Sequence, residues 1–173
     1  MLRTIGVVSA VLALSACATS APPPVATAEL AATRGNAVNG TVSFAPVGNK
    51  VRIQADVRGL KPNSEHGFHV HEKGDCSSGD GMSAGGHFNP GGSPHAHYGQ
   101  MARHAGDLPN LKADANGVAV YAFETELISV TPGAPNSVIG RAVVVHANPD
   151  DYASQPAGNS GPRQACGVVR PTP

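Results

Sequence analysis

The chain has 173 residues, and its 12 lysines and arginines balance 12 aspartates and glutamates, so the formal net charge at neutral pH is zero. Aromatic residues make up 4% of the sequence, and it contains no tryptophan. This composition excludes a nucleic-acid-binding protein that depends on a broad basic surface.

Residues 1–17 have the features of a secretion signal. Arg3 precedes an apolar run that ends in small residues before Cys17, and the run is too short to be a spanning helix. The ending Leu14-Ser15-Ala16-Cys17 is similar to a bacterial lipobox, in which the cysteine becomes the lipidated first residue of the mature protein. The alternative is an ordinary signal peptide cleaved nearby, with Cys17 discarded. We expect a periplasmic or cell-envelope protein whose membrane contact is a lipid on Cys17. Ala18, in place of an aspartate, favours the outer membrane.

Residues 18–35 show no apolar periodicity and include three consecutive prolines, which is typical of a disordered tether. We expect residues 36–170 to form one domain, which is long enough to have a proper core. If Cys17 carries lipid, Cys76 and Cys166 remain in an oxidising compartment, and a disulfide between them is the natural outcome.

Short alternating segments follow in chain order. A run over 38–44 and a second over 51–57 alternate apolar and polar residues as half-buried strands do, and Gly48-Asn49 between them indicates a hairpin. A turn at 114–117 precedes an apolar run over 118–124, and short β-branched runs occupy 138–146 and 165–169. No segment has a convincing helical period. The sequence therefore predicts an all-β fold, an antiparallel sandwich or barrel.

Two segments, 73–113 and 147–163, lack this pattern and are rich in glycine and proline. Irregular stretches of this length need another source of order in a compact domain. We expect two long functional loops held by metal and by the disulfide.

The histidines suggest two metal-ligand sets. His69 and His71 are two apart in an apparent strand, so they share one face while Val70 points to the other, although a solvated strand face would give the same pattern. His146 ends an apolar strand and needs a partner for its ring. These three imidazoles suit copper, which prefers nitrogen donors. A second set suits structural zinc, namely His87, His95, His104 and Asp107.

Two segments resemble the signatures of the copper/zinc superoxide dismutase family, GFHVHEKGDCS at 67–77 and GNSGPRQACGVV at 158–169. The segments SAGGHFNP and RHAGDLPNL between them are also similar to family patterns, so the resemblance covers about 36–169. It implies a Greek-key, immunoglobulin-like β-sandwich or barrel over residues 36–170. It also implies one copper ion (Cu²⁺/Cu⁺) and one Zn²⁺ per subunit.

The resemblance also implies roles for single residues. His87 would be the fourth copper ligand beside His69, His71 and His146, and would bridge to zinc, which His95, His104 and Asp107 also bind. The implied catalytic residues are Arg163, which orients superoxide, and His87, which supplies a proton. Asp150 would link His69 to His95, with Asp151 as its competitor. The Cys76–Cys166 disulfide also matches the family. His66 resembles a structural histidine, and we expect His97 to be an exposed loop residue.

The activity implied is dismutation of superoxide to O₂ and H₂O₂ by a copper redox cycle, which would protect the cell envelope. An alternative is a periplasmic protein that buffers copper and zinc without turnover, in which Arg163 would have no role. A zinc hydrolase needs an open zinc position, and this zinc set has four protein ligands. Lys73 is a candidate for steering the substrate, and the subunit arrangement, monomer or homodimer, stays open.

Overall fold

The computed structural model describes residues 22–173, so the predicted signal segment and Cys17 lie outside the described residues. The described chain forms ten strands and one 3₁₀ turn, η1 (Met82–Ala84). The strands are β1 (Ala26–Ala32), β2 (Asn39–Val47), β3 (Lys50–Arg58), β4 (Glu65–His66), β5 (Phe68–His71), β6 (Leu111–Lys112), β7 (Ala119–Thr125), β8 (Ala142–His146), β9 (Arg163–Val168) and β10 (Arg170–Pro171). In this part of the chain, no helix is long and apolar enough to cross a membrane.

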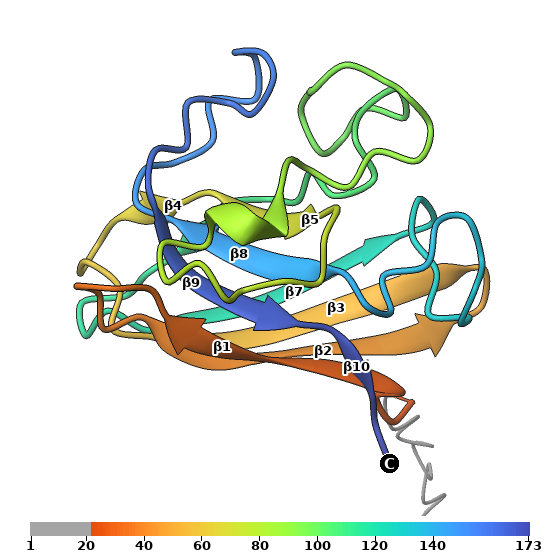
Figure 1. Cartoon of the computed structure of the whole chain (residues 1–173), viewed down its shortest axis with the longest axis horizontal. Helices are drawn as coiled ribbons and strands as arrows, with labels where there is room; N and C mark the ends of the chain where they lie inside the picture. Colours follow the sequence, from red (N-terminus) through yellow and green to blue (C-terminus); the bar gives the residue numbers. More distant parts are fainter. Residues whose placement is uncertain (1–21) are drawn as a thin grey trace, which may run out of the picture.

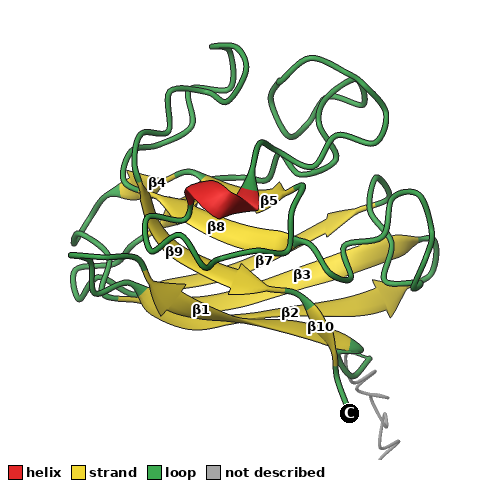
Figure 2. Ribbon diagram, in the orientation of Figure 1, coloured by secondary structure: helices red, strands yellow, loops and turns green. Residues whose placement is uncertain are grey.

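Eight of the strands form one antiparallel sheet, which curls into a half-barrel (Figures 1 and 2). Its order is β5-β8-β9-β1-β2-β3-β7, with β10 beside β1, while β4 and β6 pair separately. The hairpin predicted at Gly48-Asn49 joins β2 to β3, which pair over their whole length. The predicted all-β antiparallel fold is therefore confirmed, as a single sheet curled around its core.

The predicted tether at 18–35 is wrong for its second half, because β1 occupies Ala26–Ala32. This strand lies inside the sheet, paired with β2 on one side and with β9 and β10 on the other. Its buried residues are Ala26, Ala28 and Leu30, two of them small. Hydrogen bonds on both edges keep this weakly apolar segment in the sheet, so the ordered domain begins near Val25, whose N–H donates to the Phe44 carbonyl.

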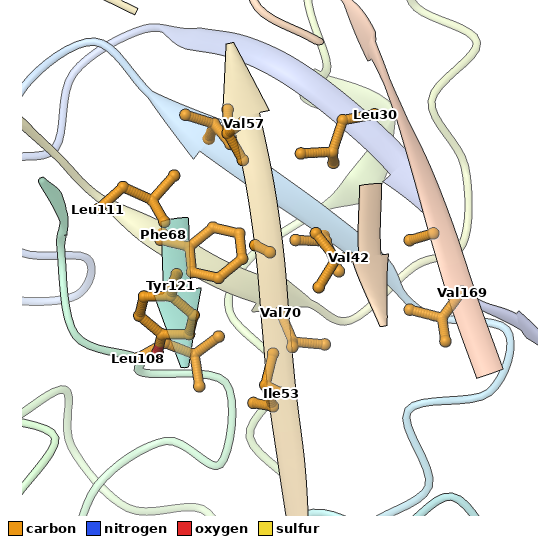
Figure 3. Close-up of a cluster of buried hydrophobic side chains, with 14 of the residues drawn as sticks. Leu30, Val42, Ile53, Val57, Phe68, Val70, Leu108, Leu111, Tyr121 and Val169 are labelled. Atoms are coloured by element: carbon orange, nitrogen blue, oxygen red, sulfur yellow. The ribbon is translucent and has the colours of Figure 1, made fainter. Parts of the chain in front are cut away.

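The core lies on the concave side of the curled sheet. In β3 the four apolar residues are buried while the residues between them face outward, as the alternation predicts. Figure 3 shows Ile53 and Val57 packing among side chains from other strands and from the segment before β6. Burial of each large side chain stabilises the fold by roughly 1.5–3 kcal/mol.

The two long loops, residues 72–110 and 147–162, rise from the same side of the half-barrel (Figure 1, green and blue). The predicted disulfide between Cys76 and Cys166 is present, with a sulfur–sulfur distance of 2.02 Å, and attaches the first loop to β9. The second loop connects β8 to β9 directly. Both loops are therefore fixed to β9, which pairs with β8, and β8 pairs with β5; β5 and β8 carry the strand histidines.

Candidate metal centre

Strand alternation places the first two histidines. In β5, Phe68 and Val70 belong to the main core, while His69 and His71 point to the opposite face. That face of the sheet also carries Ala142 and Val144 of β8, which form a second, smaller apolar cluster. All four residues of β5 are buried, Phe68 and Val70 in the main core, and His69 and His71 because the loops cover their face. The histidine pair therefore lies beneath the loops and away from solvent.

Four buried histidines beneath the loops form a set of nitrogen ligands that suits copper, which we call the copper-type set. The ligand nitrogens of its four buried members lie within 4.8 Å of one another: His69, His71, His87 and His146. His71 Nε2 is 3.3 Å from His146 Nε2. The register of β8 and β9 shifts between Val145 and His146, and such bulges commonly re-aim a side chain beside a functional site.

In three of these histidines, the ring nitrogen that faces away from the other ligands makes a hydrogen bond. His71 Nδ1 donates to the Gly85 carbonyl at 2.9 Å, and His146 Nδ1 donates to the Gly161 carbonyl at 3.1 Å. His69 Nε2 donates to Asp150 at 2.7 Å. In each ring the remaining nitrogen therefore carries a lone pair, and these lone pairs face one another. Opposed lone pairs in a dry site fit a nitrogen-binding cation such as copper.

A zinc-type set lies next to it. The Nδ1 atoms of His87, His95 and His104 are 2.8, 3.0 and 3.2 Å from the same Asp107 oxygen. Ligand atoms around a tetrahedral zinc with bonds of 2.0–2.2 Å stand about 3.3–3.6 Å apart, so these atoms need to move apart only slightly to reach that geometry. His87 belongs to both sets. Its Nδ1 faces the zinc side, and its Nε2 is buried with no hydrogen-bond partner among the described residues, as a bridging ligand requires.

The electrostatics of the two sets differ. Burial lowers the pKa of His69, His71 and His87, and it lowers the pKa of His146 to about 4, so the copper-side rings are neutral at pH 7. Burial also opposes the charged form of His95, but the nearby carboxylates outweigh it and raise that pKa to about 9. Neutral imidazoles are ready to bind metal, whereas zinc must displace the His95 proton.

Asp150 joins the two sets, as predicted in preference to Asp151. Its two oxygens accept from His69 Nε2 at 2.7 Å and from His95 Nε2 at 3.0 Å. Asn110 holds Asp150 in place, since its side chain accepts from the Asp150 N–H and donates to the Asp150 carbonyl. Asp151 is exposed and hydrogen-bonds within its own turn instead. An aspartate in this position fixes the orientation of both rings.

Arg163 lies at the mouth of the copper-type set. A cavity of about 290 Å³ is lined by His146, Arg163, Met82 and Gln155, among others. The half-buried guanidinium donates to the carbonyls of Gly81 and Gly85, and Gly85 also accepts from the copper-side ring of His71. Burial lowers the pKa of Arg163, yet an arginine stays charged at neutral pH. A fixed positive charge therefore faces the space next to a copper ligand.

The remaining histidines are not in either set. His66 is buried and hydrogen-bonds both the Ser64 hydroxyl and the His146 carbonyl, which agrees with its predicted structural role. The prediction that His97 is an exposed loop residue is wrong. Its ring is partly buried, with its centroid 4.0 Å from that of Tyr98 and 4.8 Å from that of Tyr152.

Two residues of the site were missed by the sequence analysis, Asn110 and Gln155. Asn110 holds Asp150, and Gln155 contacts the main chain of His95. A single asparagine or glutamine in a loop gives no signal by itself, because its role depends on which segment lies against it.

Comparison with known proteins is consistent with this geometry. The family model for copper/zinc superoxide dismutase matches residues 38–169. A Cu-Zn superoxide dismutase of Deinococcus radiodurans is 41% identical and covers 98% of both chains. One from Paramecium bursaria Chlorella virus 1 is 47% identical over 76% of this chain and 72% of its own length. The clock protein EA4 is similar in structure, with a TM-score of 0.76, 40% identity and coverage of 87% of this chain and 96% of its own. This chain belongs to the copper/zinc superoxide dismutase family, with its copper site and its zinc site both complete.

Proposed function

We propose that this chain protects the cell envelope by dismutating superoxide, with Arg163 guiding the anion and His87 handling a proton. The observation that carries this proposal is the position of Arg163 in the same cavity as the copper ligand His146. When bound, copper supplies one-electron redox chemistry, while zinc has no redox chemistry and holds its loop.

Arg163 acts on the substrate before any reaction. Superoxide is a small anion, and a guanidinium offers five N–H donors. Two contacts, to the carbonyls of Gly81 and Gly85, fix the plane of the group and leave other donors for the anion. Because the walls of the cavity are partly apolar, the charge is less screened than on an open surface. Arg163 therefore attracts superoxide and orients it next to His146.

His87 is suited to a proton transfer at Nε2. Its Nδ1 lies 2.8 Å from Asp107 on the zinc side, which fixes the ring. Its Nε2 has no hydrogen-bond partner among the described residues and points to the copper side. This nitrogen can hold a proton and then give it to the departing peroxide, which must be protonated to leave as H₂O₂.

A protein that only buffers metal is the alternative function. Such a protein needs the same ligands but gains nothing from an arginine held at two carbonyls in the cavity. The discriminating experiment measures superoxide consumption by the purified domain before and after loading with copper and zinc. Dismutation should require copper. If the fully loaded protein does not accelerate superoxide loss, the protein is a metal buffer.

We also propose that the protein is a lipoprotein tethered to the outer membrane through Cys17. Support comes from the charged start, the apolar run and the small residues before this cysteine, and from Ala18 after it. Metabolic labelling with a fatty acid tests this, with Cys17→Ala as the control. The wild-type chain should carry label in the membrane fraction, and an unlabelled chain released into the periplasm would contradict the anchor.

A further inference from the structure

The loop at 147–162 grips the zinc ligand His95 by its main chain, through the side chain of Gln155. The Gln155 amide oxygen accepts from the His95 N–H at 3.0 Å, and the amide nitrogen donates to the His95 carbonyl at 2.7 Å. One side chain thereby uses both main-chain groups of a single metal ligand. Neither contact involves the groups that bind metal.

The orientation of this amide is unambiguous. A main-chain N–H can only donate and a carbonyl can only accept, so the Gln155 oxygen must face the first and its nitrogen the second. Paired hydrogen bonds fix direction as well as distance. His95 cannot shift along its chain without moving Gln155.

A second grip on His95 comes from the same loop. Asp150 accepts from the far nitrogen of its ring at 3.0 Å. Gly158 lies against this contact so closely that a Cβ there would clash with the Asp150 carboxylate, and its φ of +65° also favours glycine. One loop therefore holds His95 at three atoms, while the fourth contact of the residue, ring Nδ1, is left for zinc.

Gln155 also lines the cavity beside the copper-type set, together with His146 and Arg163. We propose that Gln155 is a positioning residue that couples zinc binding at His95 to the conformation of the loop around the copper cavity. Zinc fixes the His95 ring, and the main chain of His95 fixes Gln155. Gln155 in turn fixes the rim of the copper cavity, meaning the part of loop 147–162 that lines it. Because such coupling is reciprocal, a loosened rim must also weaken zinc binding.

The test uses copper-free protein, so its result does not depend on dismutation. Hydrogen exchange of segment 151–161 is measured with and without zinc, and zinc affinity is measured by competition with a chelator. In the wild-type protein zinc should slow exchange in this segment. In Gln155→Ala we expect this protection to be lost and zinc affinity to fall about 3- to 10-fold, the effect of two partly exposed neutral hydrogen bonds. Gln155→Glu should behave similarly, since one carboxylate oxygen would face the His95 carbonyl.

Ser154→Ala is the matched control. Ser154 is the neighbour of Gln155, and its hydroxyl bonds to Asp151 within the loop without touching His95. This variant should keep both the zinc-dependent protection and the affinity. The inference is overturned if zinc still protects the segment in Gln155→Ala, because coupling would then pass through Asp150 alone. It is also overturned if Ser154→Ala loses the protection equally, or if the strands of Gln155→Ala, and not only segment 151–161, exchange like unfolded protein with zinc present, because Gln155 would then support the whole fold.

Discussion

Replacing Asp150 by asparagine should weaken copper binding more than zinc binding. The two carboxylate oxygens of Asp150 have different surroundings. Oδ1 accepts from the Tyr152 N–H at 2.6 Å and from His95 at 3.0 Å, whereas Oδ2 accepts from His69 alone. In Asp150→Asn the amide oxygen should keep the position with two donors. The amide nitrogen then faces the N–H of His69.

This places two donors against each other in a buried site. His69 can relieve the conflict by moving its proton from Nε2 to Nδ1, but Nδ1 is the nitrogen left for copper. A buried donor without an acceptor costs roughly 1–3 kcal/mol, which corresponds to about a 5- to 150-fold loss of copper affinity. Zinc loses a negative charge near His95 but keeps the hydrogen bond, so its loss should be several-fold smaller.

Chelator competition, performed separately for each metal, measures both affinities. Asp151→Asn is the matched control, since it makes the same chemical change one residue away on an exposed side chain that bonds only within its own loop, to Ser154 and Asn159. We expect both metal affinities of the control to stay within about twofold of wild type, as is usual for a surface change. Unchanged copper affinity in Asp150→Asn, with the fold intact by circular dichroism, would refute the orienting role. An equal loss in Asp151→Asn would refute it too.

Four further outcomes are expected. Arg163→Ala should keep its metal content but react more slowly with superoxide than wild type, and its rate should depend less on ionic strength, in measurements at equal metal loading. If the salt dependence of the rate is unchanged, Arg163 is only a packing residue. His87→Ala should lower the affinity for both metals, and magnetic coupling should appear in wild type, but not in the variant, when Cu²⁺ occupies both sites. Reduction of Cys76–Cys166 opens a loop of 90 residues and should lower the free energy of unfolding by up to about 4–5 kcal/mol in urea titrations. Acid should destabilise the metal-free protein. Burial lowers the pKa of His146 to about 4, below the unfolded value near 6.5. The contribution of His146 to the free energy of unfolding is therefore complete above pH 6.5 and is lost as the pH falls towards 4.

The parts of the fold that could be predicted are those encoded locally. Alternation in β3 identifies both faces of a strand without knowledge of its neighbours, and the two-residue spacing of His69 and His71 fixes their shared face. The histidines themselves suggested the two ligand sets, but the role of His87 as fourth copper ligand and bridge needed the family resemblance, because the zinc set spans 21 residues of irregular loop. No periodicity describes such a loop.

What could not be predicted depends on neighbours that are distant in sequence. The alanines of β1 look like tether residues until β2 and β9 supply hydrogen bonds on both edges. His97 is polar and lies in a loop, so exposure is the natural expectation, yet Tyr152 from the other loop packs against it. Gln155 has a role only because the second loop lies against His95. In each case tertiary contact outweighs a weak local signal.

The site also explains why metal and fold depend on each other. Four buried ring nitrogens of the ligand sets lack a full hydrogen bond among the described residues. His69 Nδ1 and His87 Nε2 have no partner, and His95 Nδ1 and His104 Nδ1 have only one Asp107 oxygen, which they share with His87. An unpaired buried nitrogen costs roughly 1–3 kcal/mol in a metal-free fold. Ion binding removes this cost at the same atoms, and it does so only in the folded chain, where the four converge. Metal binding should therefore stabilise the folded state directly. Because three of these atoms lie in loop 72–110, which has little strand structure, that loop depends on metal for its order more than the sheet does.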